Sequence, residues 1–200
     1  TKSEQEHEAL TKVEALIHQY SDKFDAAYFT MYSKKLGMST FDNNNKVLIN
    51  DLLTIMQTKS LDYTQTFLQL TQSLTDEISA KEMNNKLGDW YQTWILALGQ
   101  EELNQEYEPQ NRYQQAQDLM KVNNPVVIPR NHHVEAILEY CENIIGHEPE
   151  SINNTTKEKV AKAVEDFLEV LRSPYQKIEA TKKYQDVSGD EKYYQTFCGT

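Results

Sequence analysis

Residues that break helices are scarce in this chain. The 200 residues include only 6 Gly and 5 Pro, and these two residue types are the strongest punctuators of regular structure. Between them, apolar residues recur at steps of three and four, which is the spacing of one face of a helix. No segment shows the apolar–polar alternation that a strand would need. The sequence therefore predicts an all-α domain, and a chain of this length can bury a core without disulfides or metals.

The first helical segment extends from Ser3 to about Leu36. Its apolar residues form a single stripe, namely Leu10, Val13, Leu16, Ile17, Tyr20, Phe24, Ala27, Tyr28, Met31 and Leu36. This stripe predicts one long helix or two nearly continuous ones. Gly37 follows as the expected C-cap, because a residue without a Cβ adopts the left-handed conformation at least cost.

The same spacing predicts further helices along the chain. These are expected to begin at Asn43–Asn45, after Asp62 as an N-cap, near Leu87, near Pro109, at Asn131 and at Thr156. Residues 76–85 are polar and are left unassigned or weakly helical. Together the segments predict a bundle-like domain of about six to eight helices over residues 1–174. An irregular, extended tail, aromatic and polar, is expected over residues 175–200.

The composition excludes several kinds of partner. The formal net charge is −11, whereas binding of nucleic acid needs clustered Lys and Arg. An acidic surface is repelled by anionic lipid, and no apolar run approaches the length of a membrane span. The two cysteines form no CxxC pair, which indicates a reducing compartment. We therefore expect a cytoplasmic protein with neither a nucleic-acid nor a membrane partner.

Motifs of catalysis and nucleotide binding are absent from the sequence. The glycines are scattered singly, so neither GxGxxG nor GxxxxGK[ST] occurs. The HRD and DFG signatures of kinases and the GxSxG turn of hydrolases are also missing. The chain by itself is therefore expected to contain no catalytic residue and no cofactor-binding residue.

Four potential metal ligands lie close together in the sequence, at His132, His133, Cys141 and His147. Adjacent histidines on a helix point about 100° apart, so His132 and His133 are not expected to serve one metal. His133 and Cys141 share a helix face but are two turns apart. Ordinary caps and core contacts are the favoured interpretation, and no metal site is expected.

Several other residues are candidates for structural or interdomain roles. Trp90 and Trp94 lie four residues apart on one face, which favours packing over a ligand shelf or a partner surface. Arg130 is expected either to form a buried ion pair or to reach a partner domain. Asn131 is a candidate N-cap. Cys141 lies on the apolar face of its helix and is expected to be buried and inert.

Short motifs occur in a fixed order along most of the chain. They are Lys35-Leu36-Gly37, Leu48 to Met56, Leu61 to Phe67, the pair Trp90 and Trp94, Asn124 to Ile137, Leu168 to Tyr175, and the terminal Phe197-Cys198-Gly199-Thr200. In this order they resemble the C-terminal region of the selenoprotein O family. Each motif alone is weak, but the ordered set is specific. Tyr175, at the end of the sixth motif, joins the candidate interdomain or structural residues.

The resemblance implies an activity for a longer protein. Members of this family carry a kinase-like domain, in effect a pseudokinase, N-terminal to this region. They are described as transferring AMP from ATP to protein hydroxyls of Ser, Thr or Tyr with Mg²⁺ or Mn²⁺. The start of the chain at Thr1 is consistent with a piece of such a protein. The chain would then be a non-catalytic helical domain whose partners are the kinase-like domain and, for the whole enzyme, its protein substrates.

Cys198 is the one residue to which the resemblance assigns a redox role. The family tail carries a redox-active residue near its end, and this thiol stands two residues from the end of the chain. A reversible disulfide with the kinase-like domain would couple oxidation to activity. Without a partner, Cys198 would be an ordinary surface thiol.

A second function remains open at this stage. The alternative is a self-contained, acidic helical module that binds another protein through a groove. The two alternatives predict different amounts of exposed apolar surface. A domain separated from its kinase-like partner is expected to expose a large apolar patch, whereas an independent module is expected to be polar apart from its groove.

Overall fold

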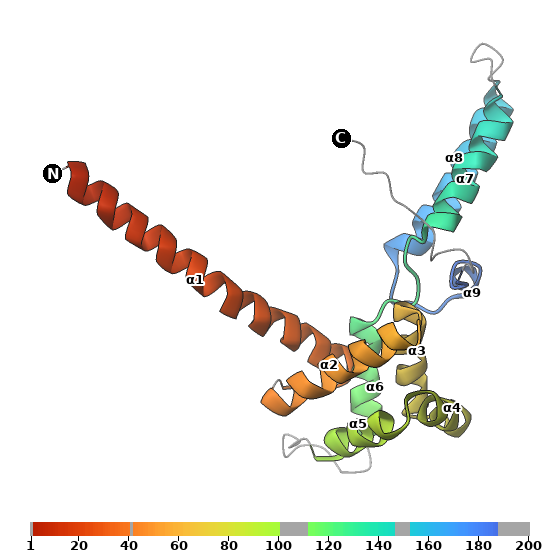
Figure 1. Ribbon diagram of the computed structural model, residues 1–200. Helices are drawn as coiled ribbons and strands as arrows, with labels where there is room; N and C mark the ends of the chain where they lie inside the picture. Colours follow the sequence, from red (N-terminus) through yellow and green to blue (C-terminus); the bar gives the residue numbers. More distant parts are fainter. Residues whose placement is uncertain (1, 41, 101–111, 147–152, 188–200) are drawn as a thin grey trace. The chain divides into compact units, whose positions relative to one another are not determined.

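The computed structural model describes residues 2–40, 42–100, 112–146 and 153–187 (Figure 1). These residues form helices and connecting segments without a strand, which confirms the all-α prediction. The helices within the described ranges are α1 (Lys2–Lys35), α2 (Asn43–Thr58), α3 (Tyr63–Ser73), α4 (Glu77–Leu87), α5 (Asp89–Gln100), α6 (Arg112–Asn123), α7 (Asn131–Ile145), α8 (Asn154–Arg172) and α9 (Glu179–Lys182). None of them is long and apolar enough to cross a bilayer.

The chain divides into two compact units. The first unit consists of Thr1–Leu61 and Gln69–Asn123, and the second of Asp62–Leu68 and Asn124–Thr200. Helical spacing alone predicts a single helical region over residues 1–174, because it does not reveal which helices share a core.

The end of α1 explains why glycine stands at position 37. The helix is continuous from Lys2 to Lys35, as the apolar stripe predicts. Gly37 then adopts a φ of +79° and donates its N–H to the Lys34 carbonyl at 3.1 Å. A Cβ at Gly37 would lie 2.9 Å from the Ala116 Cβ of α6. Both the backbone conformation and the close approach of α6 therefore require a residue without a side chain.

Two tryptophans of α5 form the centre of the first unit. Trp94 is fully buried, and Trp90 is 7 % exposed. Their rings stack with centroids 5.9 Å apart and an interplanar angle of 13°. The indole N–H of Trp90 donates to the Leu48 carbonyl at 2.8 Å, and that of Trp94 donates to the Leu36 carbonyl at 3.0 Å. The pair thus joins α5 to α2 and to the end of α1.

Helix α4 is the segment that the sequence prediction left unassigned. Asp76 caps it by accepting a hydrogen bond from the Ser79 N–H at 2.7 Å, and Gly88 follows its last residue. Only Met83 and Leu87 are buried in this helix. Two apolar anchors in eleven residues are too few to produce a recognisable stripe, so the caps were the only usable signal.

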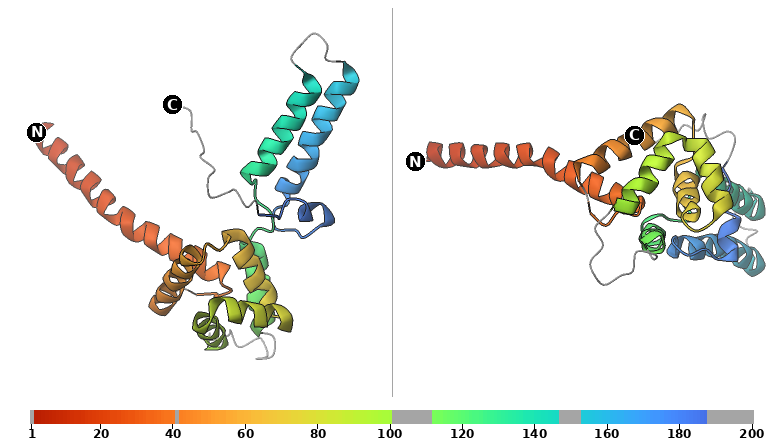
Figure 2. Two further views of the ribbon diagram at one scale, coloured as in Figure 1. Left: turned by 45° about the vertical axis from the view of Figure 1, so that its right-hand side comes forward. Right: turned by 90° about the horizontal axis from the view of Figure 1, so that it is seen from below.

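Helices α7 and α8 lie side by side in the second unit (Figure 2). Near one end of the pair, a compact core is formed by Val126, Val127, Phe167, Val170 and Tyr184, with Leu68, Val134, Ile137 and Leu171 packed against it. The segment after α8 also contributes, because the Pro174 carbonyl accepts the Val126 N–H at 2.7 Å. Among the described residues of the second unit, the segment that ends at Leu68, the segment before α7, both long helices and the segment after α9 all contribute to this core.

The helical part extends beyond residue 174. The described residues 175–187 include the short α9, and within them Thr181 is fully buried and Tyr184 is 6 % exposed. Tyr184 packs on Phe167 with ring centroids 4.9 Å apart. A single aromatic anchor and one helical turn are too short to produce a periodic signal in the sequence.

Candidate functional site

A buried ion pair lies at the start of α7. The Arg130 side chain is 4 % exposed and the Asp62 side chain 18 % exposed. The guanidinium donates two parallel hydrogen bonds to the carboxylate, from Nη1 to Oδ2 at 2.9 Å and from Nη2 to Oδ1 at 2.8 Å. This bidentate geometry is the strongest form of such a pair. Of the two roles predicted for Arg130, the structure shows the buried ion pair.

Asp62 also caps the N-terminus of α3. Its Oδ1 atom accepts the Gln65 N–H at 2.7 Å, which confirms the predicted N-cap of α3. Burial alone raises the pKa of the Asp62 carboxyl. The hydrogen bonds from Arg130 and from the Gln65 backbone, with the Arg130 charge, outweigh burial and hold the pKa below its ordinary value. The group therefore stays ionised at neutral pH and holds two elements of the second unit together.

The predicted cap of α7 is wrong by one residue. Asn131 is already helical and exposed, and the N-cap position is occupied by Arg130 with an extended backbone at φ −69° and ψ 139°. No side chain caps this helix end. The Arg130 side chain is used instead for the ion pair with Asp62.

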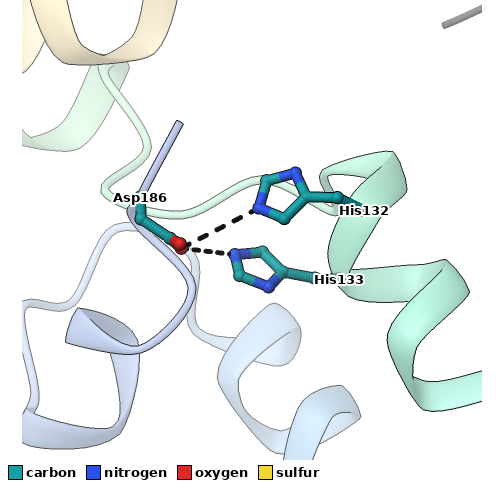
Figure 3. Close-up of side chains that lie close together, drawn as sticks. All are labelled: His132, His133 and Asp186. Atoms are coloured by element: carbon teal, nitrogen blue, oxygen red, sulfur yellow. Dashed lines mark ion pairs between the residues drawn. The ribbon is translucent and has the colours of Figure 1, made fainter. Parts of the chain in front are cut away.

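Two histidines and an aspartate converge beside this ion pair (Figure 3). The Asp186 Oδ1 atom lies 2.8 Å from Nε2 of His133 and 3.9 Å from Nε2 of His132. The two imidazole rings are 4.0 Å apart between centroids and tilted by 45°. Helix geometry predicts that adjacent histidines diverge. The structure brings both rings to one carboxylate, which the segment after α9 supplies.

This group has the composition of a metal site. Within the described ranges it is the one set of three His, Cys, Asp or Glu residues whose ligand atoms all lie within 4.8 Å of one another. His132 and His133 are half-buried and Asp186 is exposed. The sequence analysis missed Asp186, because nothing near it in the chain marks it as a ligand.

His133 occupies the most shielded position of the three. Its ring meets Tyr184 edge to face, with centroids 5.2 Å apart. Burial lowers the pKa of His133, and the neighbouring His132 and Arg130 lower it further. The Asp186 carboxylate raises the pKa by less than these effects lower it. The imidazole of His133 is therefore neutral near pH 7 and retains a lone pair.

A pocket of about 430 Å³ adjoins His133, between α7, α8 and the segment around α9. Its lining includes Tyr140, Tyr184, Lys159, Lys162 and Lys183. Asp166 lines the same pocket and pairs with Lys162 at 3.4 Å. The pocket leaves room next to His133 for water.

The other candidate residues lie apart from this group. Tyr175 is 50 % exposed. Cys141 of α7 is buried, as its place on the apolar face predicts. Trp90 and Trp94 belong to the core of the first unit. Cys198 and His147 lie outside the residues that the structure describes.

Comparison with known proteins identifies the family. Residues 7–177 match the family described as protein adenylyltransferase SelO. Three relatives are each called protein nucleotidyltransferase YdiU. That of Teredinibacter turnerae is 34 % identical over 188 residues, which are 94 % of this chain and 34 % of the relative. That of Pseudoalteromonas translucida is 31 % identical over 199 residues, 99 % of this chain and 36 % of the relative. That of Bacillus cereus is 31 % identical over 198 residues, 98 % of this chain and 36 % of the relative.

The match covers nearly all of this chain but only part of each relative. The chain spans about a third of the length of the curated relatives it matches. All the ordered motifs from Lys35 to Tyr175 fall inside the matched residues 7–177. The chain belongs to the protein adenylyltransferase SelO family.

Proposed function

We propose that this chain is a non-catalytic, C-terminal helical domain of a protein adenylyltransferase and packs on the kinase-like part of the same protein. The whole enzyme would transfer AMP from ATP to Ser, Thr or Tyr hydroxyls of protein substrates, with Mg²⁺ or Mn²⁺. The support is the family match, the chain's share of about a third of its relatives, and a sequence without a phosphate-binding loop. The spacing of its cysteines favours the cytoplasm.

The apolar stripe of α1 is the observation that carries this proposal. Its positions 10, 13, 17, 20, 24, 27 and 31 alternate in steps of three and four, which is the seam of a helix that packs along another helix. The side chains of this seam are exposed, with Leu10 at 60 %, Ile17 at 66 % and Phe24 at 53 %. An apolar row of this length on a soluble domain is typical of an interaction surface.

The seam is continuous with the core of the first unit. Tyr20, Phe24, Tyr28 and Tyr32 follow one another along α1, with successive ring centroids 6.2, 5.9 and 4.7 Å apart. Tyr32 is only 8 % exposed, whereas Tyr20 is 69 % exposed. The aromatic row thus passes from packed to solvent-facing along one helix. We assign the cover of this row to helices of the kinase-like part, since the row extends along α1 from Leu10 as a long exposed stripe.

Two charges placed in this seam are expected to abolish docking. The double variant Ile17→Asp/Phe24→Asp should weaken binding to the separately produced kinase-like part by at least about thirtyfold, because buried anchors contribute 2 kcal/mol or more. Its free energy of unfolding should change by less than about 1 kcal/mol, since both side chains are exposed and Phe24 contacts only the neighbouring rings of Tyr20 and Tyr28. Calorimetric titration and chemical denaturation give the two numbers.

A matched control places the same charges on the other side of α1. Ala15→Asp/Gln19→Asp adds two carboxylates outside the seam and should bind as the unmodified chain does. Equal binding by the seam variant and this control would contradict the docking surface. So would a chain that forms only homodimers through α1 and never binds the kinase-like part.

The proposal includes redox control through Cys198, which lies outside the described residues. Exchange of its thiolate with an oxidised disulfide such as glutathione disulfide, and then with a thiol of the kinase-like part, would form an internal disulfide and release two glutathione thiols. AMP transfer by the full-length protein should then depend on the glutathione redox state, and Cys198→Ser should remove that dependence. Cys141→Ser is the control, because Cys141 is buried. Unchanged redox dependence in Cys198→Ser would rule out this switch.

A further inference from the structure

We propose that His132, His133 and Asp186 bind one divalent transition-metal ion of the Zn²⁺ class. The three side chains come from the start of α7 and from the segment after α9, so both lie in the second unit.

Two of the three separations between ligand atoms bracket the value that a small ion requires, and all three are within 4.8 Å. A tetrahedral Zn²⁺ with bonds of about 2.0–2.1 Å keeps its ligand atoms about 3.3 Å apart. The Asp186 Oδ1 atom lies 2.8 Å from Nε2 of His133 and 3.9 Å from Nε2 of His132. These separations fall on either side of the required value by similar amounts. Small rotations of the exposed Asp186 carboxylate would equalise them.

The contact between His133 and Asp186 is short and shielded. The Nε2 atom of His133 is buried and lies 2.8 Å from the Asp186 Oδ1 atom. A polar atom in that position costs free energy unless something satisfies it. An ion between the nitrogen and the carboxylate would satisfy both atoms.

The ligand set selects the class of metal. Imidazole nitrogen suits Zn²⁺, Cu²⁺, Ni²⁺ and Co²⁺, whereas Mg²⁺ and Ca²⁺ prefer sites made of oxygen. The nearby positive charge of Arg130 is neutralised by its bidentate pair with Asp62. Three protein ligands leave at least one position for water, and the pocket beside His133 provides the space. The bound ion would join the start of α7 to the segment after α9.

Titration of the metal-free chain with Zn²⁺ tests the proposal, with Co²⁺ absorption as a second readout and Mg²⁺ as the comparison metal. One Zn²⁺ should bind per chain. His132→Gln, His133→Gln and Asp186→Asn should each weaken binding at least about tenfold, which is the least that disturbing a metal's surroundings costs. Asp186→Asn retains a hydrogen-bond acceptor and lies at an exposed position, so it separates a metal role from a structural one.

His18→Gln is the matched control, since His18 is exposed on α1. It should leave the affinity for Zn²⁺ unchanged, and circular dichroism should show the native helix content in every variant. The proposal is overturned if the chain binds no Zn²⁺, or if Mg²⁺ binds as tightly. It is also overturned if Asp186→Asn and His133→Gln bind Zn²⁺ as the unmodified chain does, or if His18→Gln removes the binding.

Discussion

Asp62→Asn is expected to lower the free energy of unfolding of the second unit by about 3–5 kcal/mol, the usual effect of removing one partner from a buried ion pair. Asparagine retains the ability to cap α3, so the loss comes from the bidentate pair with the charged Arg130, which is 5 % exposed. Urea denaturation followed by far-UV circular dichroism measures the change.

The destabilisation caused by Asp62→Asn should depend on pH, because the ion pair with Arg130 requires an ionised Asp62. The folded-state pKa of Asp62 lies below its ordinary value, so the stability it contributes is present above about pH 4 and is lost as the pH falls through the folded pKa. The difference between the unmodified chain and Asp62→Asn should therefore close in acid. Asp118→Asn is the control, because its pair with Lys121 is exposed and should contribute less than about 1 kcal/mol. Equal effects of Asp62→Asn and Asp118→Asn would contradict this account.

Trp94→Ala is expected to destabilise the first unit by about 3–5 kcal/mol, the range for deleting a large buried aromatic side chain. Trp94 is fully buried, stacks on Trp90 and donates to the Leu36 carbonyl. Its removal leaves both a cavity and a buried acceptor without its donor. Denaturant unfolding followed through the fluorescence of the remaining Trp90 measures the loss.

Two further variants separate the causes. Leu96→Ala on the same helix should change the stability by less than about 0.5 kcal/mol, because Leu96 is 63 % exposed. Trp94→Phe keeps an aromatic ring but removes the N–H, so its effect should be intermediate. A loss in Trp94→Ala no larger than that in Leu96→Ala would mean that this tryptophan is not part of the core.

The sequence predicts the helices well wherever their apolar residues are periodic. The stripe of α1, the cap at Asp62 and the C-terminal glycine at position 37 were all recognisable, because each depends on residues close together in the chain. Helix α4 was not recognised, since only Met83 and Leu87 anchor it. The division into two units was also missed, because it depends on contacts between distant segments.

The sequence indicated only two of the three residues of the candidate site. His132 and His133 were noticed as possible ligands, but the argument from helix geometry treated them in isolation. Asp186 reaches them because α9 and Tyr184 pack the following segment against α7 and α8. The approach of Asp186 to the two histidines depends on tertiary contacts, which neither the spacing nor the composition of the sequence reveals.

Intact-mass spectrometry of AMP transfer tests the central claim most directly. The chain is incubated with ATP and Mg²⁺ or Mn²⁺, alone and together with the separately produced kinase-like part of the protein. The account predicts no AMP adduct on the chain alone and adducts when both parts are present. An AMP adduct on the chain incubated by itself would contradict the claim that this domain is non-catalytic.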